Sequence, residues 1–266
     1  MLLLFDIGNT NTHVGLADHR RVIKHADVPA RAWLDGTAGA AVRRFAAGRM
    51  IEGAVLCSVV PRTTPFVRRF VAQLFRERRP RDGTKAGARD TLLELTPKTL
   101  RGIGIDYPKP KSIGADRLAN SVAARRRFGA PVVIVDFGTA VTFDVVNRAG
   151  NYAGGIIAPG LAAMTDYLHE KTALLPRIKI AEVKASIGKS TEQAMLIGAV
   201  HGYRGLVREL IGELKRELKT KHLPVVATGG YAGLIASVLP EISAVEPDLT
   251  LEGLRLTWTA AHADAA

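Results

Sequence analysis

A strand-and-turn pattern occurs twice in this chain, about half the sequence apart, and it constrains the fold more than any other feature. The two copies are Leu3–Thr10 and Ile134–Thr139, and in each an apolar run ends in an aspartate, Asp6 or Asp136. Glycine and a hydroxyl residue follow each aspartate closely, and a second strand-like stretch comes next. The repeat predicts two related halves, each built on a strand hairpin.

The residues of these turns suit the phosphate tail of a nucleotide. Glycine lets backbone N–H groups approach a phosphate closely, and threonine and asparagine add hydrogen-bond donors. A carboxylate can hold a hydrated cation, because hard metal ions prefer oxygen ligands. One Asp-x-Gly turn alone is weak evidence for a phosphate site, because Asp and Gly are ordinary turn residues at the end of a strand. Two copies with the same chemistry favour two phosphate-gripping turns that face each other across a cleft.

Composition bounds the size and the compartment. The chain has 266 residues, 47% of them hydrophobic, which is enough for one large or two modest domains. Its single cysteine, Cys57, lies in an apolar run, where a buried thiol is expected, and one cysteine forms no internal disulfide. These features favour a reducing cytoplasm. The apolar start, residues 1–5, is too short for a signal peptide, and no apolar run approaches the roughly 18 residues of a membrane span.

The chain is basic, with a formal net charge of +12. Such a charge suits nucleic acid and anionic small molecules equally. Most basic clusters follow helical patterns with acidic neighbours, which is typical of solvated helix faces, and no zinc-finger or RNA-binding signature accompanies them. We therefore expect an anionic small-molecule substrate and no nucleic-acid partner.

Hydrophobic periodicity predicts strands that alternate with helices in both halves. The expected strands are 2–6, 12–16, 21–25, 54–60, 92–95, 131–136, 141–147, 152–157 and 223–227. The expected helices are 30–47, 64–78, a helix that opens at 114–117, 159–170 and 191–218. Residues 79–89 are loop-like, and the turn 228–232 fits a nucleotide contact or a tight strand-to-helix turn equally.

Asp116 lies in the first turn of the helix that opens between the two repeats. An aspartate is favoured there because it offsets the helix dipole, which is one interpretation. The other is catalytic, because phosphoryl transfer to a hydroxyl needs a carboxylate that accepts the hydroxyl proton. The turns already commit Asp6 and Asp136 to phosphate and cation binding, so Asp116 is the natural base.

Five ordered motifs resemble one family over almost the whole chain. They are Asp-Ile-Gly-Asn-Thr-Asn (6–11), Gly-Ala-Asp-Arg (114–117), Asp-Phe-Gly-Thr-Ala-Val-Thr-Phe-Asp (136–144), Gly-Gly-Ile-Ile-Ala-Pro-Gly (154–160) and Thr-Ala-Leu-Leu-Pro (172–176). Together they are similar to the type III pantothenate kinases, which include the Bvg accessory factor-like proteins. These belong to the superfamily of acetate and sugar kinases, Hsp70 chaperones and actin.

The resemblance implies an α/β fold of duplicated ribonuclease H-like domains, each a mixed sheet flanked by helices, with a cleft between them. We expect domains at 1–113 and 114–266, with a C-terminal helix that can return to the first. The implied activity is ATP-dependent phosphorylation of pantothenate to 4′-phosphopantothenate, the first step of coenzyme A biosynthesis. Alternatives are a non-catalytic transcriptional accessory protein, or another small-molecule kinase or phosphohydrolase of the superfamily.

The resemblance also implies ligands and roles. ATP is the phosphoryl donor, used with a divalent cation such as Mg²⁺ and a monovalent cation, K⁺ or NH₄⁺. Asp116 is the general base. The residues that bind ATP are Asp6, Ile7, Gly8, Asn9, Thr10, Asn11, Thr12, His13 and Thr139, and those from Asp6 to His13 hold its phosphates. Metal ligands are Asp6 for the divalent ion and Asp136 for the monovalent ion. Pantothenate is bound by Tyr107, Gly114, Ala115, Asp116, Arg117 and Thr191.

The helix expected at 191–218 bears on assembly. It is apolar on more than one side, with Met195, Ile197, Leu206 and Ile211 beyond its main stripe, so it needs cover on more than one side. A second subunit or the chain's own sheet can supply that cover. The resemblance favours a homodimer and places Thr191 at the partner's substrate.

Overall fold

The protein is described by a computed structural model over residues 1–77 and 91–263. These residues form two compact units, one made of 1–127 and the C-terminal segment from Asp248, the other of 128–247. Along the chain, the first boundary between the units falls between residues 127 and 128, whereas the sequence predicts a domain boundary between 113 and 114. The loop-like stretch 79–89 lies outside the described residues.

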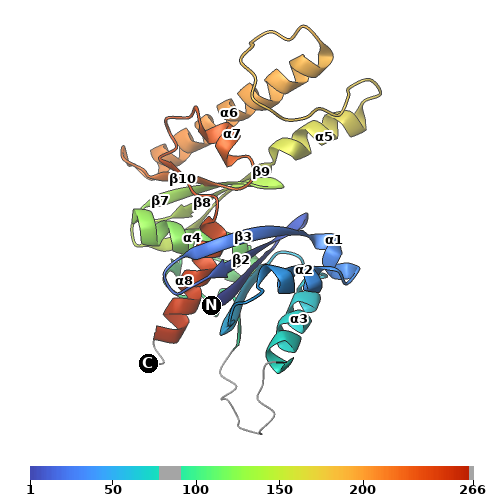
Figure 1. The fold of residues 1–266 in the computed structure, drawn as a ribbon. Helices are drawn as coiled ribbons and strands as arrows, with labels where there is room; N and C mark the ends of the chain where they lie inside the picture. Colours follow the sequence, from blue (N-terminus) through green and yellow to red (C-terminus); the bar gives the residue numbers. More distant parts are fainter. Residues whose placement is uncertain (78–90, 264–266) are drawn as a thin grey trace, which may run out of the picture. The chain divides into compact units, whose positions relative to one another are not determined.

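The sheet of the first unit has the strand order β3-β2-β1-β4-β5, and Figure 1 labels its strands β2 and β3. Its strands are β1 (Leu2–Ile7), β2 (Asn11–Ala17), β3 (Val22–Pro29), β4 (Gly53–Ser58) and β5 (Leu92–Glu94). The first three form an antiparallel meander, while β4 runs parallel to β1 and β5 parallel to β4. The apolar residues of β1 and β4 are buried, as expected for central strands covered on both faces.

Helices α1 (Ala30–Leu34), α2 (Ala38–Phe45) and α3 (Thr64–Glu77) contribute to one core cluster of the first unit. In that cluster Phe5, Trp33 and Phe70 pack edge to face with ring centroids 5.7–6.4 Å apart. The prediction of one helix over 30–47 is wrong, because residues 35–37 are not helical and separate α1 from α2. Gly36 adopts a positive φ of 82° there, which interrupts the helix.

Helix α8 (Leu249–Ala263) contacts β1, β2, β3 and β4, and α4 (Ala115–Phe128) packs against it (Figure 1). The contact with α4 is close because Gly253 leaves no room for a side chain against the backbone of Ala119. The Thr250 hydroxyl donates to the Asn120 side-chain oxygen at 2.8 Å across the same contact. The C-terminal helix thus belongs to the first unit.

The second unit repeats the frame of the first. Strands β7 (Val132–Phe137), β8 (Ala140–Val146) and β9 (Asn151–Pro159) form the antiparallel meander. The strands β10 (Val225–Thr228) and β11 (Ala244–Val245) add in parallel, so that the five strands of this unit have the order β11-β10-β7-β8-β9. Two mixed sheets of matching topology confirm the predicted duplicated α/β fold.

Helices α5 (Leu161–Lys171), α6 (Thr191–Glu217) and α7 (Ala232–Ala236) contribute to the core of the second unit. The buried residues Val200, Tyr203, Val207 and Ile211 follow helical spacing along α6. The prediction that a helix starts at Pro159 is wrong, because Pro159 pairs with Ala140 and ends β9. Within the described residues, no helix has the length and apolar character needed to cross a membrane.

Candidate active site

The first Asp-x-Gly turn is open. Ile7 and Thr12 form the last pair of the β1–β2 ladder, and four residues connect them. The Gly8 N–H closes the turn by donating to the Asn11 carbonyl at 3.0 Å. Asn9 and Thr10 stand exposed at its tip. Exposed amide and hydroxyl groups are the donors that a phosphate would need.

The predicted phosphate-binding residues of this turn do not all face solvent. Ile7 is buried in the core cluster, and the buried Thr12 hydroxyl accepts a hydrogen bond from the Trp33 indole at 3.0 Å. His13 pairs with Asp27 on β3 through Nδ1 at 2.6 Å. These three residues therefore fix the hairpin, whereas Asn9 and Thr10 at its exposed tip are open to a ligand.

Asp6 lies beside a thiol that sequence reasoning does not connect to it. Asp6 and Cys57 are paired between the parallel strands β1 and β4, and the thiol donates to Asp6 Oδ1 at 3.4 Å. Burial raises the pKa of Cys57 well above its usual range, and the charges of Asp6 and Asp116 raise it further. The partnership depends on strand register, which no local sequence signal gives.

Asp116 begins α4 with a partly enclosed carboxylate. Its Oδ1 accepts a hydrogen bond from the Arg117 backbone N–H at 2.8 Å. Burial raises the pKa of Asp116, and the hydrogen bond and charge of Arg117 offset this in part. A Cβ at Gly114 would come within 3.0 Å of Asp116 Oδ1, so a side chain at that position would displace the carboxylate. A desolvated carboxylate with a raised pKa is suited to accept a proton.

Two other residues predicted to bind substrate, Ala115 and Arg117, lie on this first turn of α4. Ala115 is buried and Arg117 is half-buried on the first turn of α4. Tyr107 is exposed, in the segment between β6 (Gly104–Ile105) and the 3₁₀ helix η1 (Pro110–Ser112). The structure thus places Arg117 beside Asp116 on one helix turn and Tyr107 in a separate segment.

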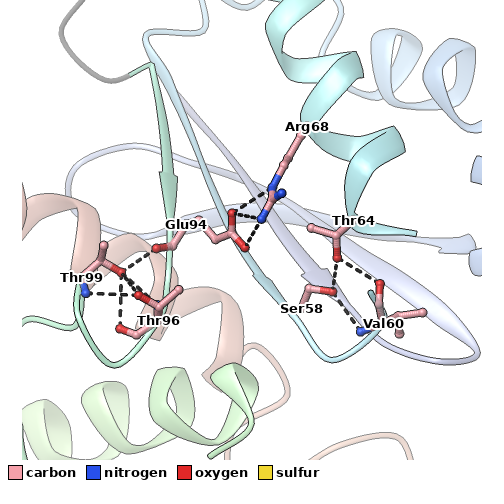
Figure 2. A network of polar contacts seen from close by, with 7 residues as sticks. All are labelled: Ser58, Val60, Thr64, Arg68, Glu94, Thr96 and Thr99. Carbon is pink, nitrogen blue, oxygen red and sulfur yellow. Dashed lines mark hydrogen bonds and ion pairs between the residues drawn. The ribbon is translucent and has the colours of Figure 1, made fainter. Parts of the chain in front are cut away.

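The connection from β4 to α3 is held by side-chain hydrogen bonds (Figure 2). Ser58 Oγ accepts from the Val60 N–H at 3.0 Å and from the Thr64 hydroxyl at 2.7 Å. Further along α3, Arg68 forms a bidentate ion pair with Glu94 on β5. This network fixes the chain just after the strand that carries Cys57, and Ser58 is a residue that sequence reasoning missed.

The second Asp-x-Gly turn is tighter. Phe137 and Val141 form the last pair of the β7–β8 ladder, with the Gly138 N–H donating to the Ala140 carbonyl at 3.1 Å. Thr139 is exposed at the tip, and its carbonyl accepts from the Gly160 N–H at 3.2 Å. The turn is therefore tied to the start of α5.

Asp136 is enclosed by the glycine turn that follows β10. Asp136 pairs with Thr228 between parallel strands, and the next residue, Gly229, has a positive φ of 89°. A Cβ on Gly229 would lie 2.5 Å from Asp136 Oδ1 and 2.7 Å from the Phe137 backbone. The tight strand-to-helix packing thus explains Gly229 without a ligand, whereas a nucleotide contact at this turn stays a prediction.

Thr191 opens α6 and is exposed. Ser190 is the N-cap, because its hydroxyl accepts from the Gln193 N–H at 3.2 Å while the Gln193 side chain accepts from the Lys189 N–H at 2.7 Å. Of the apolar residues predicted to need a partner, Ile211 is buried in the unit's own core and Leu206 packs against it. The sheet of this unit therefore covers part of that face.

The carboxylates of the two turns, Asp6 and Asp136, are the candidate cation ligands. Among residues 1–77 and 91–263, no group of three or more His, Cys, Asp or Glu side chains is arranged to hold a metal ion. Mg²⁺ in nucleotide sites needs few protein ligands, because substrate phosphates and water complete its shell. Asp6 beside an open turn fits that donor set, and Asp136 offers a carboxylate beside a tight glycine turn.

Comparison with known proteins identifies close relatives along the chain. A family model described as type III pantothenate kinase matches residues 2–213. A type III pantothenate kinase from Methylacidiphilum infernorum is 42% identical over 258 residues, which cover 96% of this chain and 87% of the relative. One from Akkermansia muciniphila is 44% identical over 255 residues, which cover 96% of each chain.

Solved structures of low identity share the fold. A Campylobacter jejuni protein assigned to the Baf family of transcriptional activators aligns with a TM-score of 0.57 at 17% identity and covers 96% of each chain. A Cytophaga hutchinsonii protein assigned as a sugar kinase aligns with a TM-score of 0.51 at 13% identity and covers all of both chains. At these identities the likeness concerns the fold alone.

Proposed function

Because this chain belongs to the type III pantothenate kinase family, we propose that it is a cytoplasmic kinase that transfers the γ-phosphoryl group of ATP to pantothenate. The product is 4′-phosphopantothenate, which enters coenzyme A biosynthesis. The observation that carries the proposal is the pair of carboxylates, Asp6 and Asp116: the Cys57 thiol near the end of β4 donates to Asp6 Oδ1 at 3.4 Å, and the charges of both carboxylates raise the pKa of that thiol. One suits a phosphate-bound cation and the other suits a base.

Asp116 acts as the general base in this proposal. It accepts the proton of the pantothenate primary hydroxyl as the oxygen attacks the γ-phosphorus and the bond from that phosphorus to the ADP oxygen breaks. Burial raises its pKa, so that the carboxylate holds a proton more readily than an exposed aspartate does. The Arg117 N–H on Asp116 Oδ1 fixes the carboxylate in one orientation.

The open first turn holds the phosphate tail of ATP. Asn9 and Thr10 supply exposed donors, and Gly8 allows the backbone to approach a phosphate. Asp6 would hold the divalent cation through an oxygen ligand. That ion, when bound, neutralises negative charge on the phosphates. Thr12 and His13 support the turn from the core side and from β3.

Arg117 binds the carboxylate of pantothenate, since a guanidinium matches a carboxylate with two parallel hydrogen bonds. In this proposal, Gly114, Ala115 and Tyr107 contact the rest of the pantothenate molecule. In the second unit, Thr139 contacts ATP and Asp136 would hold K⁺ or NH₄⁺. Thr191 contacts pantothenate in a homodimer, as an exposed residue at the start of α6.

The test is ADP release by the purified protein with and without pantothenate, in potassium and in sodium buffer. We expect ADP release that requires pantothenate, is faster in potassium, and yields a product heavier than pantothenate by one phosphoryl group. ADP release that is unchanged by pantothenate would contradict the proposal. Equal rates in potassium and sodium would contradict the proposed monovalent cation.

A further inference from the structure

A hollow beside the first turn carries two arginines that the proposed function does not use. Its volume is about 360 Å³, and its lining includes Asn9 and Thr10 of the turn, Arg31 of α1, and Arg62 and Thr63 of the β4–α3 connection. We call it the arginine groove. No described residue that lines it is acidic. The groove is therefore continuous with the exposed donors of the turn and is positively charged.

The segments that carry the two arginines are fixed to the turn and to β4. The Ala30 N–H donates to the Thr10 carbonyl at 2.9 Å, which ties the start of α1 to the tip of the turn. The Thr63 N–H donates to the Val60 carbonyl at 3.0 Å, inside the hydrogen-bonded connection drawn in Figure 2. The two arginines thus belong to a supported frame.

The two arginines of the groove differ from Arg43 and Arg68 of the same unit in their ion pairing. Arg43 and Arg68 form two-pronged pairs with glutamates. In the described part of the chain, neither Arg31 nor Arg62 forms a salt bridge. Asp35 feels the charge of Arg31, but its pKa is lowered mainly by hydrogen bonds from Thr37. The two guanidiniums are consequently available to an anion.

We propose that the arginine groove binds the phosphates of the nucleotide beyond the α-phosphate, with Arg31 and Arg62 as their side-chain ligands. This inference rests on the proposed function, because the turn that borders the groove is the proposed phosphate site. Guanidinium groups bind phosphoryl oxygens with paired, charge-assisted hydrogen bonds. The groove then selects for a polyphosphate tail, and it makes Arg31 and Arg62 determinants of specificity for nucleoside triphosphates over monophosphates.

The test compares equilibrium binding of ATP, AMP and tripolyphosphate to the full chain, by calorimetry at one fixed salt concentration. The variants are Arg31→Ala, Arg62→Ala and the double variant, and Arg44→Ala, an exposed arginine outside the groove lining, is the matched control for lost charge. We expect each groove variant to weaken ATP and tripolyphosphate binding by roughly tenfold or more. Binding of AMP should stay unchanged, and Arg44→Ala should bind as the unaltered protein does.

Three outcomes of the binding measurements would overturn the proposed role of the arginine groove. They are unchanged ATP binding in the double variant, an equal loss for AMP and ATP, or an equal loss in Arg44→Ala. A rise in KM for pantothenate with an unchanged KM for ATP would assign the arginines to the substrate carboxylate instead, and would also overturn it. The protein could bind tripolyphosphate through Arg31 and Arg62 and yet fail to phosphorylate pantothenate. That result would support the phosphate-binding role of the arginine groove and contradict the proposed function.

Discussion

The two Asp-x-Gly turns share a strand frame but differ in what surrounds the aspartate. At the first turn, Asp6 faces the Cys57 thiol of the neighbouring parallel strand, and Asp116 adds a second carboxylate that acts on the same thiol. At the second turn, Asp136 faces Thr228, and Gly229 packs directly against it. The first turn has four connecting residues and the second has three.

The duplicated frame thus sets the position of each aspartate in its turn. The neighbouring strand and helix determine which groups surround its carboxylate. A turn with a long exposed tip and a second carboxylate suits phosphates, a divalent cation and proton transfer. A short turn closed by glycine leaves one carboxylate in a confined place, which suits a single cation.

The largest effect is expected at Asp116, the carboxylate that has no counterpart among the residues described around the second turn. Asp116→Asn should lower turnover by roughly 10²–10⁴-fold, the usual loss when a general base is removed. ATP affinity should change little, because the substitution leaves the turn at Asp6 intact. Steady-state turnover and ATP binding are the measurements, and near-normal turnover in the folded variant would remove Asp116 as the base.

The pH dependence sharpens the same point. Because burial raises the pKa of Asp116 above 3.8, the rate should fall on acidification with a midpoint above that value. The ionised carboxylate is the form that burial disfavours, so it costs stability as pH rises through the folded pKa. Asp116→Asn should therefore unfold at an equal or higher temperature near pH 7, and the difference should vanish in acid. A lower unfolding temperature near pH 7 would contradict the enclosed carboxylate.

The next largest effect is expected at Gly229. Gly229→Ala places a Cβ against Asp136 and the Phe137 backbone at a positive φ, which should destabilise the fold by roughly 2–4 kcal/mol. Gly230→Ala is the matched control, because no atom lies within 4 Å of a Cβ there. Urea unfolding of both variants measures the difference. Equal stabilities would show that the second turn is not closed by Gly229.

A smaller effect is expected at Cys57, the neighbour that distinguishes Asp6 from Asp136. Cys57→Ala removes the donor to Asp6 Oδ1 and should raise the KM for Mg-ATP by roughly two- to tenfold, while Cys57→Ser should restore part of the loss. Thr228→Ser at the matching position of the second unit should leave that KM unchanged. An alanine variant with an unaltered KM would show that the thiol does not position Asp6.

Sequence predicts the frame well and the neighbours of each aspartate poorly. Continuous apolar runs predict buried strands such as β1 and β7, and the repeated turn indicates the duplication. The pairing of Asp6 with Cys57, residues far apart in the chain, depends on the register between parallel strands. The interruption of the helix at Gly36 depends on the positive φ of that residue. The late start of α5 depends on the pairing of Pro159 with β8, which keeps Pro159 in a strand.

The most direct test of the division between the turns is a potassium titration of kcat for Asp6→Asn and Asp136→Asn beside the unaltered protein. We expect Asp136→Asn to lose activation by potassium, while Asp6→Asn keeps it and requires more magnesium with ATP. Full potassium activation in Asp136→Asn would contradict the proposed division of roles, as would loss of that activation in Asp6→Asn alone.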